Sequence, residues 1–236
     1  MDVAIWFRTI CRKNGLPVSD SQMAKLQEYV SSLLDWNKKI NLISRRDEEG
    51  IWERHILVSV ALLFKFDLVP DSSIVDMGTG GGLPGIPLGI LGDRLTVTLI
   101  DSIQKKIRAV SEIISTLKLE NIKAVPGRIE ELSKSAPHRN SYDYVIARGV
   151  GSITEIVSWG SPLLKRQSAG TGPERLDATK SLDRGAIILL KGGDLTQEVE
   201  QARVKLKPRE VTSYPLVIEG IDPTHLFDKK IVIVRP

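Results

Sequence analysis

The sequence predicts an α/β protein with a seven-stranded, mostly parallel sheet, an antiparallel hairpin at one sheet edge and an N-terminal helical extension. Two observations predict this fold class. From Ser72 onward, short apolar runs alternate with helical patterns, which is typical of βαβ units and a parallel sheet. Before that point the patterns are helical. We therefore expect a helical extension over residues 1–66 and the sheet domain over residues 67–236.

The extension is expected to contain two helices. Over residues 19–37, apolar side chains largely recur at helical spacing, and Ser19 with Gln22 fits a capping box at the helix start. A second helix is expected over residues 51–64, after a charged connector at residues 45–49. These helices account for most of the chain that precedes the sheet.

Seven apolar runs of strand length follow, at residues 73–77, 95–100, 122–125, 142–147, 186–190, 211–217 and 229–234. Between the second and third runs, residues 103–117 form the clearest amphipathic helix of the chain. Only Pro, Gly and Asp turn signals separate the last two runs, so they are expected to pair as an antiparallel hairpin. Residues 167–184 lack periodicity and are rich in small and polar residues, which predicts a mobile surface insertion.

Bulk properties narrow the class of protein. No apolar run approaches the roughly 18 residues of a membrane span, and the N-terminus has no secretory pattern, so we expect a soluble, cytoplasmic protein and no membrane partner. Cys11 is the single cysteine, which excludes an intrachain disulfide and a multi-cysteine metal site, and no metal is expected. The net charge of +4 suits an anionic partner but is weak evidence alone. We expect a monomer.

A glycine-rich loop comes directly after the first strand. It has the pattern D-x-G-x-G-x-G at Asp76, Gly78, Gly80 and Gly82, and a helix is expected to start near Pro84. Glycines let the backbone turn sharply and approach a ligand without an intervening Cβ. An overlapping G-x-G-x-x-G also satisfies the dinucleotide fingerprint, so both NAD and S-adenosyl-L-methionine are possible ligands.

Two carboxylates help to separate these ligands. Asp76, at the end of the first strand, would face the pyrophosphate of a dinucleotide unfavourably, whereas S-adenosyl-L-methionine carries an ammonium and a sulfonium and no phosphate. Asp101 closes the second strand, where an acid accepts both ribose hydroxyls in either class of enzyme. No tyrosine is followed four residues later by lysine, as a short-chain dehydrogenase would require. The cofactor S-adenosyl-L-methionine is therefore favoured.

The motifs carry a family resemblance. The loop pattern resembles motif I of class I S-adenosylmethionine-dependent methyltransferases, which have a Rossmann-like sheet, and the string VDMGTGGGLPGIPL resembles the bacterial RsmG (GidB) family. Further matches include the string Arg54-His55-Ile56-Leu57, Ala147-Arg148 and Lys191-Gly192 with Glu198, and the resemblance covers about residues 20 to 236. It implies N7 methylation of guanine 527 in 16S ribosomal RNA, with the rRNA or the small ribosomal subunit as partner.

The resemblance also implies cofactor contacts in the loops that follow the strands. These are Gly78, Leu83, Ile129, Glu130 and Arg148, with Asp101 at the ribose, beside Asp76, Gly80 and Gly82 of the loop. The sequence departs from the family pattern in two places. Val58 stands where the family usually has an acid, which leaves the role of His55 open, and the insertion at residues 167–184 is longer than usual.

The remaining candidates have alternative interpretations. Arg148 could clamp the methionine carboxylate or an RNA phosphate, or form a structural salt bridge, and His55 is expected to be a packed residue rather than a base. Cationic side chains are expected to touch RNA at Arg45, Arg46, Lys105, Lys106 and Lys191. No catalytic residue is predicted beyond positioning, because guanine N7 carries no proton to remove. A non-catalytic RNA-binding factor and a small-molecule methyltransferase remain as rival functions.

Overall fold

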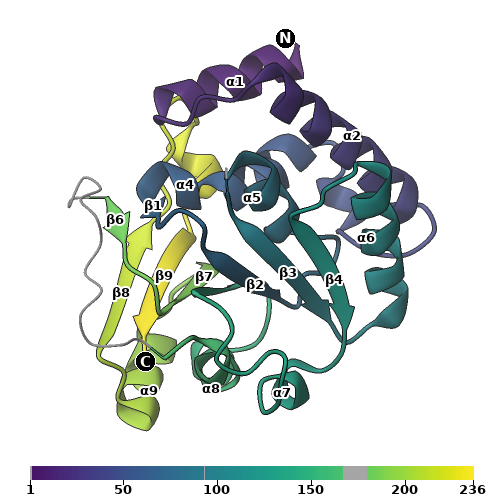
Figure 1. Cartoon of the computed structure of the whole chain (residues 1–236). Coiled ribbons are helices and arrows are strands. Elements are labelled where there is room, and N and C mark those ends of the chain that lie inside the picture. The colour runs from purple at the N-terminus through teal and green to yellow at the C-terminus, as the bar shows by residue number, and fades with distance from the viewer. Residues whose placement is uncertain (1, 93, 167–179) are drawn as a thin grey trace.

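The protein is built around one seven-stranded sheet with the predicted mixture of strand directions (Figure 1). The computed structural model describes residues 2–92, 94–166 and 180–236. The strand order is β4-β3-β2-β5-β7-β9-β8, in which β9 runs antiparallel to both of its neighbours and the other pairs are parallel. The strands are β2 (Ser73–Met77), β3 (Thr96–Asp101), β4 (Ile122–Pro126), β5 (Tyr144–Arg148), β7 (Ala186–Gly192), β8 (Glu210–Pro215) and β9 (Lys229–Arg235).

The sequence did not predict a second, two-stranded parallel sheet of β1 (Asp67–Leu68) and β6 (Ser181–Leu182). Strand β6 lies at the end of the segment that was expected to be a mobile insertion. Residues 167–179 of that segment lie outside the described residues. Its described end is therefore a paired strand that contacts the junction between the N-terminal extension and the sheet.

The helices lie before the sheet and in the crossovers. They are α1 (Val3–Lys13), α2 (Asp20–Asn37), the π-helix η2 (Trp52–Leu57), α3 (Val58–Val60), α4 (Leu62–Lys65), α5 (Gly85–Leu91), α6 (Gln104–Thr116), α7 (Ile129–Leu132), α8 (Ile153–Gly160) and α9 (Thr196–Leu206). Short 3-10 turns are η1 (Arg45–Asp47), η3 (Ser161–Leu163) and η4 (Pro223–Leu226). The helix expected over residues 51–64 is present as a π-helical turn followed by two short α-helical segments.

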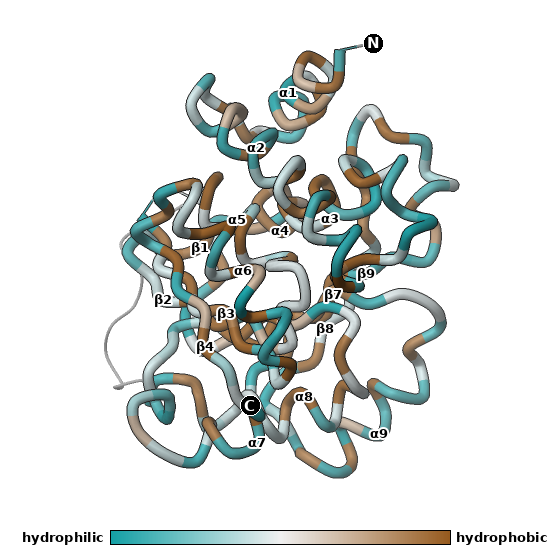
Figure 2. Tube along the Cα trace, turned by 90° about the vertical axis from the view of Figure 1, so that its right-hand side faces the viewer, coloured by the Kyte–Doolittle hydropathy of each residue, from teal (hydrophilic) through white to brown (hydrophobic). Residues whose placement is uncertain are grey.

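Two buried clusters cover the two faces of the sheet. Along β2, Ile74 belongs to the cluster with α1, α2, α5 and α6, whereas Val75 and Met77 belong to the cluster with α8 and α9. Successive strand side chains point to opposite faces, so this alternation requires helices on both sides. Figure 1 shows α7, α8 and α9 together on one side of the sheet, and Figure 2 shows hydrophobic segments around the central strands β3 and β7.

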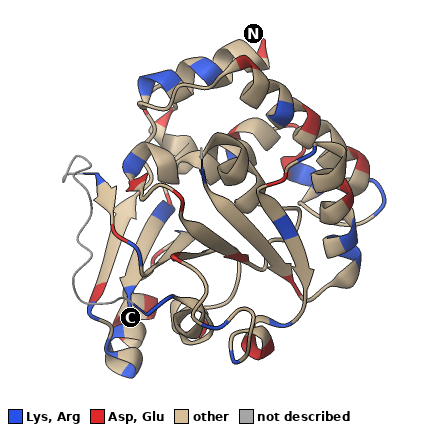
Figure 3. Cartoon of the chain, in the orientation of Figure 1, with Lys and Arg blue, Asp and Glu red and all other residues tan. Residues whose placement is uncertain are grey.

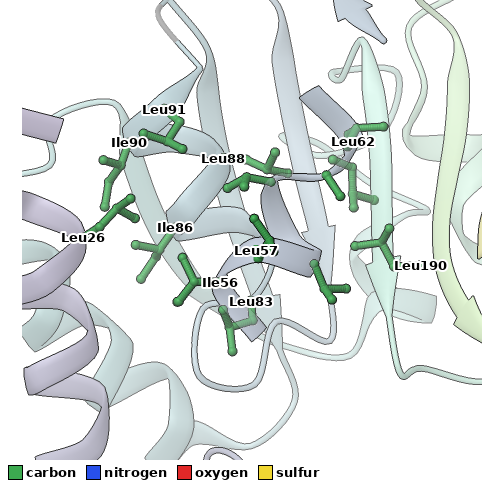
Figure 4. Close-up of a cluster of buried hydrophobic side chains, with 14 of the residues drawn as sticks. Leu26, Ile56, Leu57, Leu62, Leu83, Ile86, Leu88, Ile90, Leu91 and Leu190 are labelled. Atoms are coloured by element: carbon green, nitrogen blue, oxygen red, sulfur yellow. The ribbon is translucent and has the colours of Figure 1, made fainter. Parts of the chain in front are cut away.

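The N-terminal extension shares its core with the sheet domain. Ser19 Oγ accepts a hydrogen bond from Gln22 N, and Gln22 Oε1 accepts one from Ser19 N, which is the predicted capping box at the start of α2. Leu26 of α2 and Ile56 of η2 lie in the same buried cluster as Ile86 of α5 (Figure 4). Residues on both sides of the expected boundary at residue 66 therefore bury each other's apolar surface.

The extension also contacts the far edge of the sheet. At the end of α1, a helix that the sequence pattern did not predict, the Asn14 side chain donates to Glu219 O and accepts from Glu219 N, at 3.1 and 2.9 Å. Phe7 packs edge-on against Trp52 with ring centroids 5.3 Å apart. The connection between β8 and β9 is thus fixed to the first helix. Among the described residues, no helix has the length and apolar character to span a bilayer.

Candidate active site

The glycine-rich loop lies at the carboxyl end of β2, the edge where open parallel sheets bind ligands. Gly78, Gly80 and Gly82 have φ values of 69°, 58° and 95°, in the left-handed region that glycine adopts without strain. A Cβ on Gly78 would stand 2.4 Å from Cγ2 of Val150, and one on Gly82 would stand 2.5 Å from Cδ1 of Ile86. A Cβ on Gly80 would have no neighbour closer than 3.8 Å among the described residues, so the loop presents its open side there.

Asp76 holds the glycine loop through two hydrogen bonds. Its Oδ2 accepts hydrogen bonds from Thr79 Oγ1 at 2.7 Å and from Gly85 N at 2.9 Å, which ties both ends of the loop to one carboxylate. The side chain is buried, and within the described part of the chain its Oδ1 has no hydrogen-bond partner. Burial raises the pKa of Asp76 to about 6, against the hydrogen bonds that lower it.

Asp101 holds the same loop from the side. At the end of β3, its Oδ2 accepts from Gly80 N at 3.0 Å and its Oδ1 from Ile103 N at 2.9 Å. The backbone of Asp101 also accepts from Gly127 N at 3.0 Å, which brings the loop after β4 to the same place. That loop leads into α7, where Ile129 is buried and Glu130 is half-buried. The predicted residues after the first three strands therefore lie together.

Helix α2 covers the loop from the other side. The buried hydroxyl of Tyr29 donates to Gly81 O at 2.9 Å. Leu33, one turn further along α2, lies 2.7 Å from where a Cβ of Gly81 would be. The sequence predicts a helix over residues 19–37 that includes both residues, but no sequence pattern indicates which loop this helix covers.

Arg148, at the end of β5, points into the N-terminal extension. Its guanidinium donates to His55 O and to Ser59 Oγ, both at 3.2 Å, and to Nδ1 of His55. A guanidinium has no acceptor, so Nδ1 of His55 is unprotonated and the proton is on Nε2, which lies 3.5 Å from Asp47 Oδ2. Burial, followed by the charge of Arg148, lowers the pKa of His55 to about 4. His55 is thus a packed, neutral residue.

A cavity of about 570 Å³ opens beside Arg148. Its walls come from η1, η2, the ends of β5 and β7, η4 and the start of β9, and include Asp47, Glu53, Arg54, His55, Val150, Lys191, Asp228, Lys229 and Lys230. Val150 lines this cavity and also contacts Gly78 of the glycine loop. Five lysine and arginine residues line the cavity against three carboxylates, so its wall carries a net positive charge at neutral pH.

The residues predicted to contact RNA lie on three different elements. Lys191 lines the cavity, where its ammonium pairs with Glu198 at 2.6 Å and donates to Gly151 O at 3.0 Å. Arg45 and Arg46 are exposed on η1, and Lys105 and Lys106 lie on α6. Figure 3 shows lysines and arginines distributed over several elements, α6 and α9 among them. Of these five residues, Lys191 lines the cavity and the other four do not.

The C-terminal hairpin was expected only as an edge of the sheet. In the structure, Lys229, Lys230 and the η4 turn that precedes them form one wall of the cavity. His225 of that turn is fixed by Glu53 of η2, with Nδ1 2.5 Å from Oε1. Two consecutive lysines at the start of a strand were the available sequence signal, but an apolar strand pattern does not reveal which loops lie next to the strand.

Known proteins resemble this chain along most of its length. A protein-family model described as GidB, rRNA small subunit methyltransferase G, matches residues 22–170. Ribosomal RNA small subunit methyltransferase G of Alkaliphilus metalliredigens is 34% identical over 91% of this chain and 89% of its own length, and that of Chlorobium phaeobacteroides is 35% identical over 97% and 94%. An S-adenosylmethionine-dependent methyltransferase from Aquifex aeolicus, at 13% identity, shares the fold with a TM-score of 0.51 over 81% of this chain and 98% of its own. Because the family model spans more than half of the sequence and the relatives align along nearly all of it, the chain belongs to the GidB family of rRNA small subunit methyltransferases.

Proposed function

We propose that the protein transfers a methyl group from S-adenosyl-L-methionine to N7 of guanine 527 in 16S ribosomal RNA. Family membership makes the chain an rRNA methyltransferase. The position and the atom follow from the family resemblance of the motifs, and one observation supports methyl transfer at this site: Val150 joins the glycine loop, held by Asp76 and Asp101, to a cationic cavity. A cofactor bound over the loop and a base in the cavity would then be neighbours.

The loop fits this cofactor in shape and charge. The open side of Gly80 admits a ligand against the backbone, and the loop is flanked by two carboxylates, of which Asp76 retains an oxygen with no hydrogen-bond partner among the described residues. This negative charge favours a cationic ligand without phosphate over a dinucleotide. The proposed cofactor contacts are Asp76, Gly78, Gly80, Gly82, Leu83, Asp101, Ile129, Glu130 and Arg148.

The proposed chemistry needs alignment rather than proton transfer. S-adenosyl-L-methionine supplies an activated methyl group on a sulfonium centre. Guanine N7 carries a lone pair and no proton, so the protein has to orient the base and exclude water. The neutral His55, whose Nδ1 already accepts from Arg148, supports this assignment because it is not available to take a proton from a substrate.

The cavity suits a guanine that has been rotated out of its RNA stack. Its volume lies within the range of pockets that hold small ligands, and enzymes that modify a base commonly extrude it in this way. Arg54 can donate to the guanine O6, while Asp228 and Glu53 can accept from N1–H and the exocyclic amine. Both kinds of group are needed to distinguish guanine from adenine.

The RNA partner would be held largely by charge. We propose that 16S rRNA or the small ribosomal subunit is contacted by Arg45, Arg46, Lys105, Lys106 and Lys191, through phosphates around the cavity. Because Lys191 forms an ion pair with Glu198, part of its positive charge is neutralised, and its contribution to RNA binding is smaller than that of an unpaired lysine. We further propose that residues 1–66 act as a cap on the domain at residues 67–236, and that the protein works as a monomer in the cytoplasm.

The test is to map methylated guanine in 16S rRNA from cells with and without this protein. We expect one 7-methylguanine, at position 527, to be absent without the protein and restored by the wild-type chain. Restoration by the wild type but not by Gly80→Val would tie the product to the glycine loop. Methylation at another position or on another atom would contradict the proposal.

The two rival functions give different results. A non-catalytic RNA-binding factor would leave the methylation pattern unchanged while altering assembly of the small subunit. A small-molecule methyltransferase would consume S-adenosyl-L-methionine without RNA. The purified protein incubated with the labelled cofactor, with and without unmethylated small subunits, separates all three, and we expect label to be transferred only when the subunits are present.

A further inference from the structure

The η4 turn presents an aromatic side chain to solvent at the rim of the cavity. Phe227 is 90% exposed, the most exposed of the large hydrophobic residues in the described part of the chain. Its two chain neighbours, Leu226 and Asp228, both line the cavity. The backbone of Phe227 therefore runs along the cavity rim, while its ring faces outward. An exposed phenylalanine gains nothing for folding, because its apolar surface stays in water.

The turn that carries Phe227 is held on both sides. Asp222 caps it by accepting from Thr224 N at 2.9 Å, and His225 is fixed to Glu53. Leu226 is buried, and Asp228 O accepts from Gly193 N at 3.1 Å. The ring is thus presented from an ordered support rather than from a free loop tip, which lowers the entropy cost of binding a partner to it.

Two lysines follow the ring after a single acid. Asp228 comes directly after Phe227, Lys229 and Lys230 come next, and both lysines line the cavity with Arg54. The Lys230 ammonium donates to Gly193 O at 2.5 Å, and that of Lys229 lies 3.3 Å from Asp228 Oδ1. Proteins that bind single-stranded RNA commonly combine an exposed aromatic with nearby cations, since bases stack on the ring while the cations contact phosphates. A purely apolar protein partner would not match these charges.

We propose that Phe227 is a stacking platform for an unpaired RNA base that neighbours the methyl-accepting guanine, and that Lys229 and Lys230 contact phosphates of the same strand. This assignment rests on the proposed function, because it takes RNA as the substrate. It adds a base-contacting residue to the charge-based contacts. The ring holds the flanking nucleotide outside the cavity, so that the guanine beside it can enter.

Oligonucleotide binding tests the proposal without any methyl transfer. Fluorescence anisotropy would compare a 12-nucleotide oligoadenylate with an oligouridylate, because purines stack more strongly than pyrimidines. We expect the wild type to prefer oligoadenylate, Phe227→Ala to lose roughly ten-fold in affinity for it together with that preference, and Phe227→Trp to keep both. Lys229→Ala with Lys230→Ala should weaken both oligonucleotides alike and flatten the salt dependence.

A matched control is Val204→Ala on α9, a residue that is 65% exposed and does not line the cavity. It should behave as wild type. Equal binding of both oligonucleotides by wild type and Phe227→Ala would overturn the stacking role and leave the proposed function intact. An effect of Phe227→Ala on unmethylated small subunits alone, with unchanged oligonucleotide binding, would assign the ring to a ribosomal protein and also overturn it. A wild type that bound neither RNA nor subunits would reject the proposed function itself.

Discussion

The guanidinium of Arg148 donates to Nδ1 of His55 and so joins the end of β5 to the π-helix of the N-terminal extension. This contact keeps the imidazole neutral, with its pKa lowered to about 4 by burial and by the arginine charge. In the unfolded chain the same imidazole titrates near 6.5. The relationship therefore has consequences for stability and for catalysis that can be measured separately.

His55 should make the folded state sensitive to acid. Its depressed pKa means that its contribution to stability is fully present above about pH 6.5 and is lost as the pH falls towards about 4, because only the unfolded chain takes up the proton in this window. Asp76 acts in the opposite sense, since its pKa is raised from 3.8 to about 6 and its contribution to the stability of the fold is lost as the pH rises through about 6.

Urea unfolding of wild type and His55→Gln at several pH values isolates the contribution of the histidine from that of Asp76. We expect the difference in unfolding free energy to change by at most about 1.4 kcal/mol per pH unit. Parallel curves would show that His55 does not titrate on unfolding.

Two glycine substitutions should fail for different reasons. Gly80→Val places a side chain on the open side of the loop at a φ of 58°, so we expect a folded protein that no longer binds S-adenosylhomocysteine. Gly78→Val instead drives Cβ into Val150 and should lower the melting temperature as well. Calorimetric titration and thermal unfolding distinguish the two. NAD should bind neither variant nor the wild type, and wild-type affinity in Gly80→Val would refute the cofactor assignment.

Tyr29→Phe should report on the cover that α2 forms over the loop. The variant removes the donor to Gly81 O from a buried site, which costs about 1 kcal/mol for a neutral hydrogen bond, with a further penalty for the unpaired carbonyl. Urea denaturation measures this loss. We also expect weaker cofactor binding, because Gly81 lies in the middle of the loop. Unchanged cofactor affinity with reduced stability would restrict Tyr29 to a structural role.

The rate of methyl transfer should be nearly independent of pH above neutrality. Guanine N7 has no proton to lose, so a single-turnover profile from about pH 7 to 9 is expected to be flat. Below about pH 6 the rate should fall as Asp76 takes up a proton, and Asp76→Asn should be slower throughout and lack this fall. A bend near pH 6.5 that disappears in His55→Gln would make His55 an acid or base in the reaction.

Arg45 and Arg46 offer a test of electrostatic RNA binding by residues that do not line the cavity. Both are exposed on η1, so reversing them to glutamate should not disturb the fold. We expect weaker binding to small subunits and a salt dependence reduced by roughly 0.7 for each lost phosphate contact with single-stranded RNA. Cofactor affinity should be unchanged. Equal loss of cofactor and RNA binding would instead indicate misfolding.

The repeating parts of this fold were predictable from sequence because each has a local cause. The capping box at Ser19 depends on hydrogen bonds within one helical turn, and the strand at residues 73–77 depends on a short apolar run. The structure has both. The short pairing of β1 with β6 was missed because it joins segments that are distant in the chain and involves two residues in each strand. A sequence pattern carries no record of such a distant partner.

The candidate site was also predictable only where its residues follow neighbouring strands. Asp76 and Asp101 were placed beside the loop because the ends of neighbouring parallel strands meet at one edge. The side-chain partners of Arg148 could not be predicted, since His55 and Ser59 come from another part of the chain. The position of the C-terminal hairpin in the cavity wall could not be predicted either, because it depends on tertiary packing.

At the π-helical turn Trp52–Leu57, the structure is expected to be more sensitive to a change in the number of residues than to a change of side chain. A π turn accommodates one more residue than an α turn, and each residue added to or removed from a helix rotates the rest of that helix by about 100°. Removing one residue inside the turn would swing His55 away from Arg148, whereas removing one from the connector before it would be absorbed by the loop. Single-residue insertions and deletions at Trp52–Leu57 would therefore disrupt the junction between extension and sheet more than most substitutions do.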